Sequence, residues 1–348
     1  MKKDQMNLYK QPALVNILIT DYCNQSCSFC FARKEMKMAA KKEMSMKSYK
    51  LILKKCANAG VRRIVLAGGE PTIHSKFSEM LTHTINSNFI VNINTNGIYS
   101  DTVENAILSG GYRTVVYFNI STPGFLSSSK IRKMILQRIN RLVGKIKVVL
   151  IVTNQFLMLQ PVKRNIDLIG DELLSKVSIR IGVEGPVAGE NNYTTLDQFP
   201  LIGNNFFKTY QYLISHSPQK ILFSKSITPC MFSQEQRKKL IEDGYMQIFH
   251  CHPESENFWF SINCDLTTFM CYPLSTRDRK SINNKTSFEE VRDYYKKLQL
   301  KYDLKYVLPE CKSCPFFGLT LGKCPGPCAS FRLNAMDKIK INSERWIS

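Results

Sequence analysis

Short apolar runs alternate with amphipathic stretches along the first 215 residues. Runs rich in Val, Ile and Leu predict strands at 14–20, 63–67, 89–94, 114–120, 147–153 and 177–183. The stretches between them predict helices at 46–59, 75–86, 102–109, 129–143 and 161–175, with another near 204–215. Strands that alternate with helices are the signature of βα units and a parallel sheet. We therefore expect an α/β fold built as a partial (β/α)6 barrel; periodicity alone does not separate this from a doubly wound sheet.

The composition of the chain changes after residue 183. Gly, Asn and Pro are frequent between 184 and 205, where the pattern predicts a loop that leaves the barrel. Beyond residue 217 strand-like runs are few, and eight of the 12 cysteines lie between 230 and 328. We therefore predict a barrel domain over 1–215, a linker over 216–250 and a smaller cysteine-rich domain over 251–348.

The overall composition is that of a soluble globular protein. Hydrophobic residues make up 44% of the chain and charged residues 22%. No apolar run approaches the roughly 18 residues that span a bilayer, and the N-terminus lacks the apolar segment of a secretory signal. We therefore expect a cytoplasmic protein without a membrane segment. In that reducing compartment a cysteine-rich chain is more often metal-binding than disulfide-bonded.

The net charge is +20, because 48 Lys and Arg residues outnumber 28 Asp and Glu residues. Such a charge is compatible with a nucleic-acid partner, but the basic residues are dispersed and do not alternate with aromatic ones. The pattern therefore favours a solvated basic surface over a nucleic-acid interface. An acidic peptide or a phosphorylated substrate remains compatible with it.

Three cysteines follow the first predicted strand directly. Cys23, Cys27 and Cys30 have the spacing C-x3-C-x2-C and lie on a loop at the C-terminal end of that strand, where α/β folds place their chemistry. Structural zinc prefers a closed set of four ligands. An iron–sulfur cluster held by three thiolates leaves one iron open to another ligand. The spacing therefore favours a catalytic cluster.

Phe29 precedes the last of these cysteines, and a GGEP segment (Gly68, Gly69, Glu70 and Pro71) follows the second predicted strand. In this order the two segments resemble the cluster loop and the cofactor-binding segment of the radical S-adenosylmethionine (SAM) enzymes. The resemblance implies that the three cysteines ligate a [4Fe–4S] cluster, whose fourth iron binds the amino and carboxylate groups of SAM. It also implies an enzyme: one electron splits the sulfonium C–S bond, and the resulting 5′-deoxyadenosyl radical takes a hydrogen from the substrate.

The same resemblance indicates which residues would contact SAM. Gly68 and Gly69 would let the backbone approach it, and Glu70 would pair with its ammonium group. Phe29 would lie near the adenine, although plain core packing explains it equally well. Later strands supply three further candidates: Asn94 (or a turn-shaping asparagine), Ser121 at the ribose position and Arg180 (or an outward-facing strand arginine).

The later cysteines resemble the auxiliary-cluster domains, called SPASM or twitch, of many radical SAM enzymes. Cys251 and Cys271 fit the cysteine pair of a predicted β-hairpin, although Leu266 stands where a glycine is expected. A C-x2-C-x9-C-x3-C run follows, with nine residues where the family pattern has five, made of Cys311, Cys314, Cys324 and Cys328. The resemblance implies at least one auxiliary cluster, held by Cys251 and Cys271 with two of the later four. A closed zinc site fits the spacing as well.

Cys230 lies outside both patterns. We consider it a candidate catalytic thiol that returns a hydrogen atom to a substrate radical. An additional cluster ligand and an inert buried cysteine are the alternatives.

Together these features predict a radical SAM enzyme that acts on a peptide or a small metabolite, with an external electron donor such as flavodoxin or ferredoxin. Only 13 residues precede the first predicted strand, so we expect no N-terminal leader-binding module of the kind that many peptide-modifying members carry. The rival hypotheses are a non-catalytic zinc- or nucleic-acid-binding protein and an iron–sulfur redox sensor.

Overall fold

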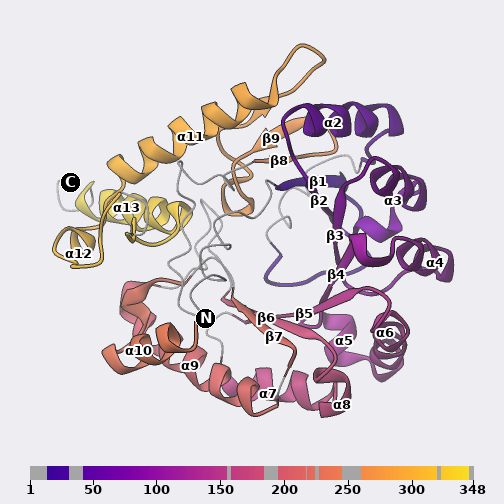
Figure 1. Cartoon of the computed structure of the whole chain (residues 1–348). Coiled ribbons are helices and arrows are strands. Elements are labelled where there is room, and N and C mark those ends of the chain that lie inside the picture. Colours follow the sequence, from indigo (N-terminus) through magenta and orange to yellow (C-terminus); the bar gives the residue numbers. More distant parts are fainter. Residues whose placement is uncertain are drawn as a thin grey trace.

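Figure 1 shows the computed structural model, which describes residues 14–30, 42–154, 158–183, 195–216, 218–223, 227–244, 260–319 and 323–344. The strands form one ten-stranded sheet in the order β10-β9-β8-β1-β2-β3-β4-β5-β6-β7. Strands β1 to β7 pair in parallel in chain order. Helices lie on the outer side of this curved sheet (Figure 1). The predicted α/β fold and partial barrel are therefore confirmed.

The six predicted strands are all present, each within one residue of its expected bounds. They are β1 (Leu14–Thr20), β2 (Arg63–Gly68), β3 (Ile90–Thr95), β4 (Thr114–Asn119), β5 (Lys147–Asn154) and β6 (Ser178–Val183). A seventh parallel strand, β7 (Lys220–Phe223), pairs with β6 inside the stretch assigned above to a linker. Its four residues contain one buried side chain, Ile221, which is too short an apolar pattern to be recognised in the sequence.

The helices that cover the barrel also follow the predicted order. They are α2 (Met46–Asn58), α3 (Phe77–Asn86), α4 (Asp101–Ser109), α5 (Pro123–Ser127), α6 (Ser129–Leu142), α7 (Leu159–Asp167), α8 (Asp171–Leu174) and α9 (Phe199–Ser215). The single helix predicted at 161–175 is wrong: Gly170 has a φ of 80°, which ends the α-helical path and separates α7 from α8. The start of α9 was also misplaced, because Pro200 lies in its first turn, where a missing N–H costs no helical hydrogen bond.

The two faces of the parallel strands differ in polarity. In β4 the side chains of Val116 and Phe118 are fully buried in the core. Since successive strand residues point to opposite faces, Tyr117 and Asn119 lie on the inner face of the barrel. Asn92 and Asn94 of β3 share that inner face, because Val91 and Ile93 are core residues; Arg180 of β6 does so between two buried isoleucines. The partial barrel therefore has a polar interior.

A predicted hairpin extends the sheet beyond its first strand. Strand β8 (Ser261–Ile262) pairs in parallel with β1 and antiparallel with β9 (Thr267–Phe269), which is followed by β10 (Lys280–Ser281). Leu266 has a φ of 67°, so it adopts the left-handed backbone that the expected glycine would adopt more easily. The cysteine-rich region is thereby joined to the barrel by backbone hydrogen bonds.

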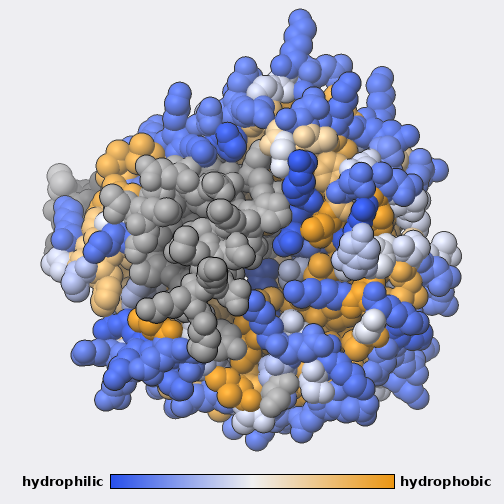
Figure 2. Space-filling view, viewed as in Figure 1, coloured by the Kyte–Doolittle hydropathy of each residue, from blue (hydrophilic) through white to orange (hydrophobic). Residues whose placement is uncertain are grey.

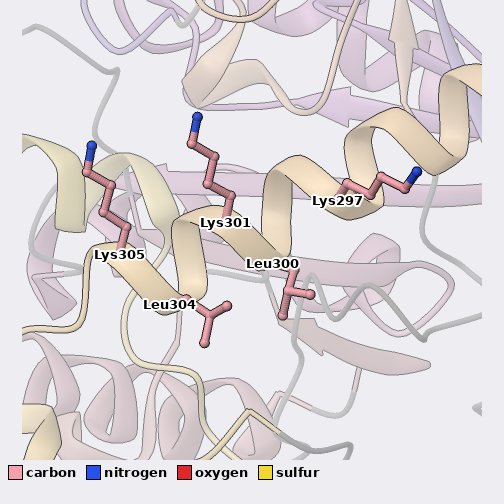
Figure 3. A pocket seen from close by; sticks show the side chains of 5 residues that line it. All are labelled: Lys297, Leu300, Lys301, Leu304 and Lys305. Atoms are coloured by element: carbon pink, nitrogen blue, oxygen red, sulfur yellow. The ribbon is translucent and has the colours of Figure 1, made fainter.

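The remaining helices are α10 (Gln234–Glu242), α11 (Phe288–Lys305), α12 (Pro309–Lys312) and α13 (Ala329–Glu344). Hydrophilic side chains cover most of the visible described surface (Figure 2). On α11 the exposed side chains of Leu300 and Leu304 project from the same side, and three lysines complete the lining of a shallow hollow (Figure 3): Lys297, Lys301 and Lys305. In the part of the chain that the structure describes, no helix is long and apolar enough to cross a membrane.

Candidate functional site

The cysteine loop begins at the end of β1, and the segment that follows the loop pairs with the last residues of β1. The amide of Asp21 donates to the carbonyl of Lys42 at 3.0 Å, and the amide of Met44 donates to the carbonyl of Ile19 at 2.7 Å. These antiparallel contacts hold both ends of the loop at the C-terminal edge of the barrel, although residues 31–41 lie outside the described ranges. The predicted position of the cysteine motif is therefore the observed one.

The three cysteines of this loop, Cys23, Cys27 and Cys30, are half-buried. Burial raises the pKa of Cys27 to about 11, and repulsion from Cys30 and then from Cys23 adds to the rise. Burial also raises the pKa of Cys23, with Glu70 and Cys30 contributing in the same direction. The amide of Gln25 lies 3.4 Å from the sulfur of Cys23. An N–H so placed stabilises a thiolate, the form in which sulfur ligates a metal.

Residues between the cysteines attach the loop to neighbouring strand ends. The Asn24 side chain donates to the carbonyl of Ile98 at 2.9 Å and accepts from the Asn96 amide group at 2.6 Å. Gln25 accepts a hydrogen bond of 2.9 Å from the amide of Gly124 at the start of α5. These contacts were not predicted from the sequence. The only indication of them in the sequence is that polar residues follow β3 and β4, whose C-terminal ends lie at the same edge of the sheet as that of β1.

The glycines of the GGEP segment allow the cysteine loop to cross the end of β2. A Cβ on Gly69 would lie 2.1 Å from the carbonyl oxygen of Tyr22, and one on Gly68 would lie 2.3 Å from that of Thr20. Gly68 also has a φ of 143°, which side-chain-bearing residues rarely adopt. The amide of Glu70 donates to the Tyr22 carbonyl at 2.7 Å. The two segments that the sequence singled out are therefore in direct backbone contact.

Glu70 is nearly fully buried, and protein donors surround its carboxylate. Oε1 accepts from the amide and hydroxyl of Thr72 and from the Thr95 hydroxyl, whereas Oε2 accepts from the amide of Asn96. Burial raises the pKa of Glu70, and these hydrogen bonds oppose that rise. Three of these four hydrogen bonds are made to Oε1 and one to Oε2. Pro71 begins the short 3-10 helix that carries Thr72.

The other predicted SAM-contact residues lie on the inner face of the barrel strands, just after a strand or in the cysteine loop. Asn94 and Arg180 occupy the inner face of the barrel; burial lowers the pKa of Arg180, which Tyr117 partly offsets. Ser121 follows β4, and its hydroxyl accepts from the amide of Thr153 at 2.9 Å. Phe29 is half-buried within the cysteine loop. None of these four placements tests a contact with SAM, so their roles stay predictions.

Residues 17–141 match the model of the radical SAM superfamily, and this range contains both the cysteine loop and the GGEP segment. The chain carries a radical SAM domain. The family's cofactors are a [4Fe–4S] cluster and SAM, and the thiols of Cys23, Cys27 and Cys30 near the buried Glu70 carboxylate fit that pair.

Two curated relatives align with parts of this chain. It is 32% identical over 84 residues to an S-adenosylmethionine-dependent nucleotide dehydratase from Selenomonas ruminantium, covering 24% of this chain and 29% of that protein. It is also 32% identical over 87 residues to the sporulation killing factor maturation protein SkfB of Bacillus subtilis, covering 25% and 21%. The alignments thus span less than a third of either relative.

Solved structures extend the likeness to almost the whole chain. Streptococcus suis SuiB bound to S-adenosylmethionine superposes with a TM-score of 0.63 at 16% identity, covering 94% of this chain and 74% of SuiB. The structure of anSMEcpe with bound AdoMet and a Cp18Cys peptide superposes with a TM-score of 0.63 at 14% identity, covering 96% and 99%. The shared fold therefore includes the C-terminal cysteine-rich region as well as the barrel.

Cys264 and Cys271, in and after the β8–β9 hairpin, lie close to the cysteine loop that follows β1. The thiol of Cys264 donates to the Asp21 carboxylate at 3.2 Å, immediately before the cysteine motif. Tyr272, next to Cys271, is an electrostatic neighbour of Cys30. Cys251 lies outside the described residues, so its predicted pairing with Cys271 stays a prediction.

The later cysteines form a second group. Cys230 and Cys314 act electrostatically on both Cys311 and Cys324, so these four thiols lie near one another, and the Cys328 sulfur lies 3.1 Å from the hydroxyl of Ser330. Within the described ranges, no three His, Cys, Asp or Glu side chains converge closely enough to hold one metal ion. A four-iron cluster separates its thiolates more widely than a single ion does.

Proposed function

We propose that this protein is a radical SAM enzyme that cleaves SAM reductively and abstracts hydrogen from a peptide substrate. The observation that carries the proposal is the meeting of three neighbouring thiols with a buried glutamate where β1 and β2 end. Both groups are needed together, since thiolates hold the iron and a carboxylate holds the ammonium group of SAM.

Cys23, Cys27 and Cys30 would hold the cluster, which leaves one iron without a protein ligand. When bound, the reduced cluster supplies the electron that splits SAM into methionine and a 5′-deoxyadenosyl radical. The protein's part is to fix distances. Asn24 and Gln25 tie the loop to two strand ends, and Gly68 and Gly69 let it cross β2 without steric overlap. Such positioning lowers the barrier by fixing reacting groups in one geometry.

Glu70 would orient SAM by pairing with its ammonium group through Oε2, the oxygen that accepts one hydrogen bond from the protein. Its other hydrogen bonds, from Thr72 and Thr95, hold the carboxylate in one rotamer. Arg180 would supply donors for the carboxylate of SAM, Ser121 would contact its ribose, and Asn94 lies on the same inner face as Arg180. Buried, pre-oriented polar groups of this kind bind a charged ligand with little reorganisation.

A peptide is the substrate class that we favour. SuiB and anSMEcpe, which share the fold over nearly the whole chain, have been solved with a precursor peptide and a Cp18Cys peptide, and SkfB is named as a maturation protein. The net charge of +20 suits an acidic peptide. A small molecule is the second candidate, favoured by the equally similar nucleotide dehydratase. An external donor such as flavodoxin or ferredoxin would supply the electron.

The decisive test is the formation of 5′-deoxyadenosine. The protein is reconstituted with iron and sulfide without oxygen, reduced, and given SAM, with Cys27→Ala as the inactive control. Cys56→Ala is the matched control, because Cys56 is buried in α2. Product from wild type and from Cys56→Ala, but not from Cys27→Ala, supports the proposal. Equal yields from all three, or zinc in place of iron, would favour the non-catalytic alternatives.

A further inference from the structure

We propose that an auxiliary iron–sulfur cluster is held by a four-thiolate site made of Cys230, Cys311, Cys314 and Cys324. This set differs from the expectation that Cys251 and Cys271 share an auxiliary cluster with two of the later four cysteines. It also gives Cys230 the role of a ligand in place of a hydrogen-donating thiol. The proposal that the bound group is an iron–sulfur cluster rests on the proposed function. The choice of the four ligands rests on the structure.

The unusual nine-residue spacing does not prevent Cys324 from meeting the C-x2-C turn. Cys311 lies in the short helix α12, and the amide of Cys314 donates to its carbonyl at 3.1 Å. The chain then doubles back, since the amide of Cys324 donates to Phe316 at 2.9 Å and its carbonyl accepts from Gly318 at 3.0 Å. This pairing places Cys324 next to the segment that follows Cys314, despite the longer spacing.

The backbone of Gly326 lies close to the sulfurs of Cys311 and Cys324. Gly326 has a φ of 92°, and a Cβ placed on it would lie 3.3 Å from the sulfur of Cys311. The backbone amide of Gly326 also donates a hydrogen bond to the Cys324 sulfur, which lowers the pKa of that thiol against the larger effect of burial. Amide hydrogen bonds to sulfur are among the groups that tune iron–sulfur clusters. The absence of a side chain at Gly326 therefore leaves space beside the Cys311 sulfur, and its amide can stabilise the Cys324 thiolate.

Cys230 is brought to this turn by the barrel. It lies in the short helix Pro229–Met231, which is seated on α9: a Cβ on Gly203 would lie 1.7 Å from the Met231 carbonyl oxygen. Arg237 joins this helix to the cysteine turn. Its guanidinium donates to the carbonyls of Pro229 and Phe232 and lies over the ring of Phe316, 4.9 Å from the centroid. Phe316 is two residues beyond Cys314.

The thiols are near enough to influence one another. Burial raises the pKa of Cys311 to about 11, and the next contributions come from Cys230 and Cys314. The pKa of Cys324 is likewise raised to about 11 by burial, with Cys230 also contributing. The Cys230 side chain is exposed, and the Thr228 hydroxyl lies 3.1 Å from its sulfur. An exposed thiol beside three others is accessible to an incoming metal cluster.

The test uses the full chain with Cys23, Cys27 and Cys30 all replaced by Ala, so that it does not depend on SAM chemistry. After anaerobic reconstitution, iron and sulfide per chain and the electron paramagnetic resonance spectrum are measured. We expect Cys230→Ala in this background to lose about four irons, or to convert one cluster into a three-iron form. Cys314→Ala should do the same, and the double variant should lose no more than either single variant. Cys56→Ala should lose none.

Alkylation gives a second readout that does not depend on cluster loss. Iodoacetamide should modify Cys230 in the apoprotein, where it is exposed, and not in the reconstituted protein. Unchanged iron, sulfide and spectrum in Cys230→Ala would overturn the proposal, as would equal modification of Cys230 with and without the cluster. Binding of about one zinc and no iron at the four cysteines would overturn the assignment of a cluster. Circular dichroism confirms that each variant is folded.

Discussion

The backbone amide of Asn96 donates a 2.7 Å hydrogen bond to Oε2 of Glu70, which joins the end of β3 to the segment after β2. Asn96 also donates through its side chain to Asn24 in the cysteine loop. One residue therefore ties together three strand ends. It fixes the cluster loop and the buried carboxylate relative to each other, which is the geometry that a bound SAM would require.

Replacing Glu70 by Gln should weaken SAM binding about 10–100-fold, because a hydrogen bond to a charged group contributes about 1.5–3 kcal/mol. Anaerobic equilibrium dialysis of the reconstituted protein measures this. Thr95→Val is the matched control: it removes one donor to Oε1 but leaves the charge, and should change the affinity less than about threefold. Wild-type affinity in Glu70→Gln would contradict the assigned role.

Gly69→Ala should impair the cluster loop, because its Cβ would overlap the Tyr22 carbonyl at 2.1 Å. Overpacking of this kind costs about 1–3 kcal/mol. We expect lower thermal stability and a large loss of 5′-deoxyadenosine yield. Gly60→Ala serves for comparison: Gly60 has a φ of 71° with nothing within 4 Å of its Cβ, so it should lower stability but keep the yield. Equal yields in both variants would count against a positioning role of Gly69.

Glu43 gives the loop a pH-dependent contact. Burial alone would raise the pKa of its carboxyl, but hydrogen bonds from the hydroxyl and amide of Ser75 outweigh this and hold the pKa below its ordinary value. A carboxyl group whose pKa is lower in the folded than in the unfolded protein stabilises the fold at pH values above the unfolded-state pKa. This stabilisation is lost as the pH falls through the folded-state pKa. Ser75→Ala should therefore lower apoprotein stability by up to about 1 kcal/mol at pH 7.

The difference between wild type and Ser75→Ala should shrink as pH falls through the lowered pKa of Glu43, because the carboxyl group becomes protonated in both proteins. Thermal denaturation from pH 3.5 to 7 measures it, provided that both proteins remain folded over that range. Ser109→Ala is a suitable control, since its hydroxyl donates to a backbone carbonyl and to no titrating group. A difference that stays constant with pH would show that Glu43 is not the group involved.

Arg332 of α13 and Asp303 of α11 form a buried ion pair, in which each side chain is less than 5% exposed. Removing one partner of such a pair costs about 3–5 kcal/mol, because the other charge stays buried. Arg332→Met should therefore lower the unfolding free energy by that amount, as urea denaturation measures. Replacing both residues, Arg332→Met with Asp303→Leu, should recover part of the loss. Lys176→Met, at an exposed ion pair, should change stability little.

Strand and loop positions in the barrel were accessible from sequence because their determinants are local. The run Leu14–Thr20 has the apolar pattern of a buried strand, and the cysteine motif follows it directly. Where a local feature was weak, the prediction was wrong: Gly170 interrupts an otherwise helical pattern, and Lys220–Phe223 is too short to be detected. The predicted domain division and the roles of the SAM-contact residues stay predictions.

Contacts between distant segments were not accessible in this way. Asn16 of β1 contacts Ser261 of β8 across 245 residues, which places the hairpin cysteines beside the barrel. Cys230 likewise meets Cys311 only because Gly203 seats its helix on α9 and Arg237 reaches Phe316. Local periodicity and spacing determine which elements form and which residues can act as ligands. Only packing of the whole chain decides which of those ligands meet, since that depends on side-chain volumes and hydrogen bonds between remote elements.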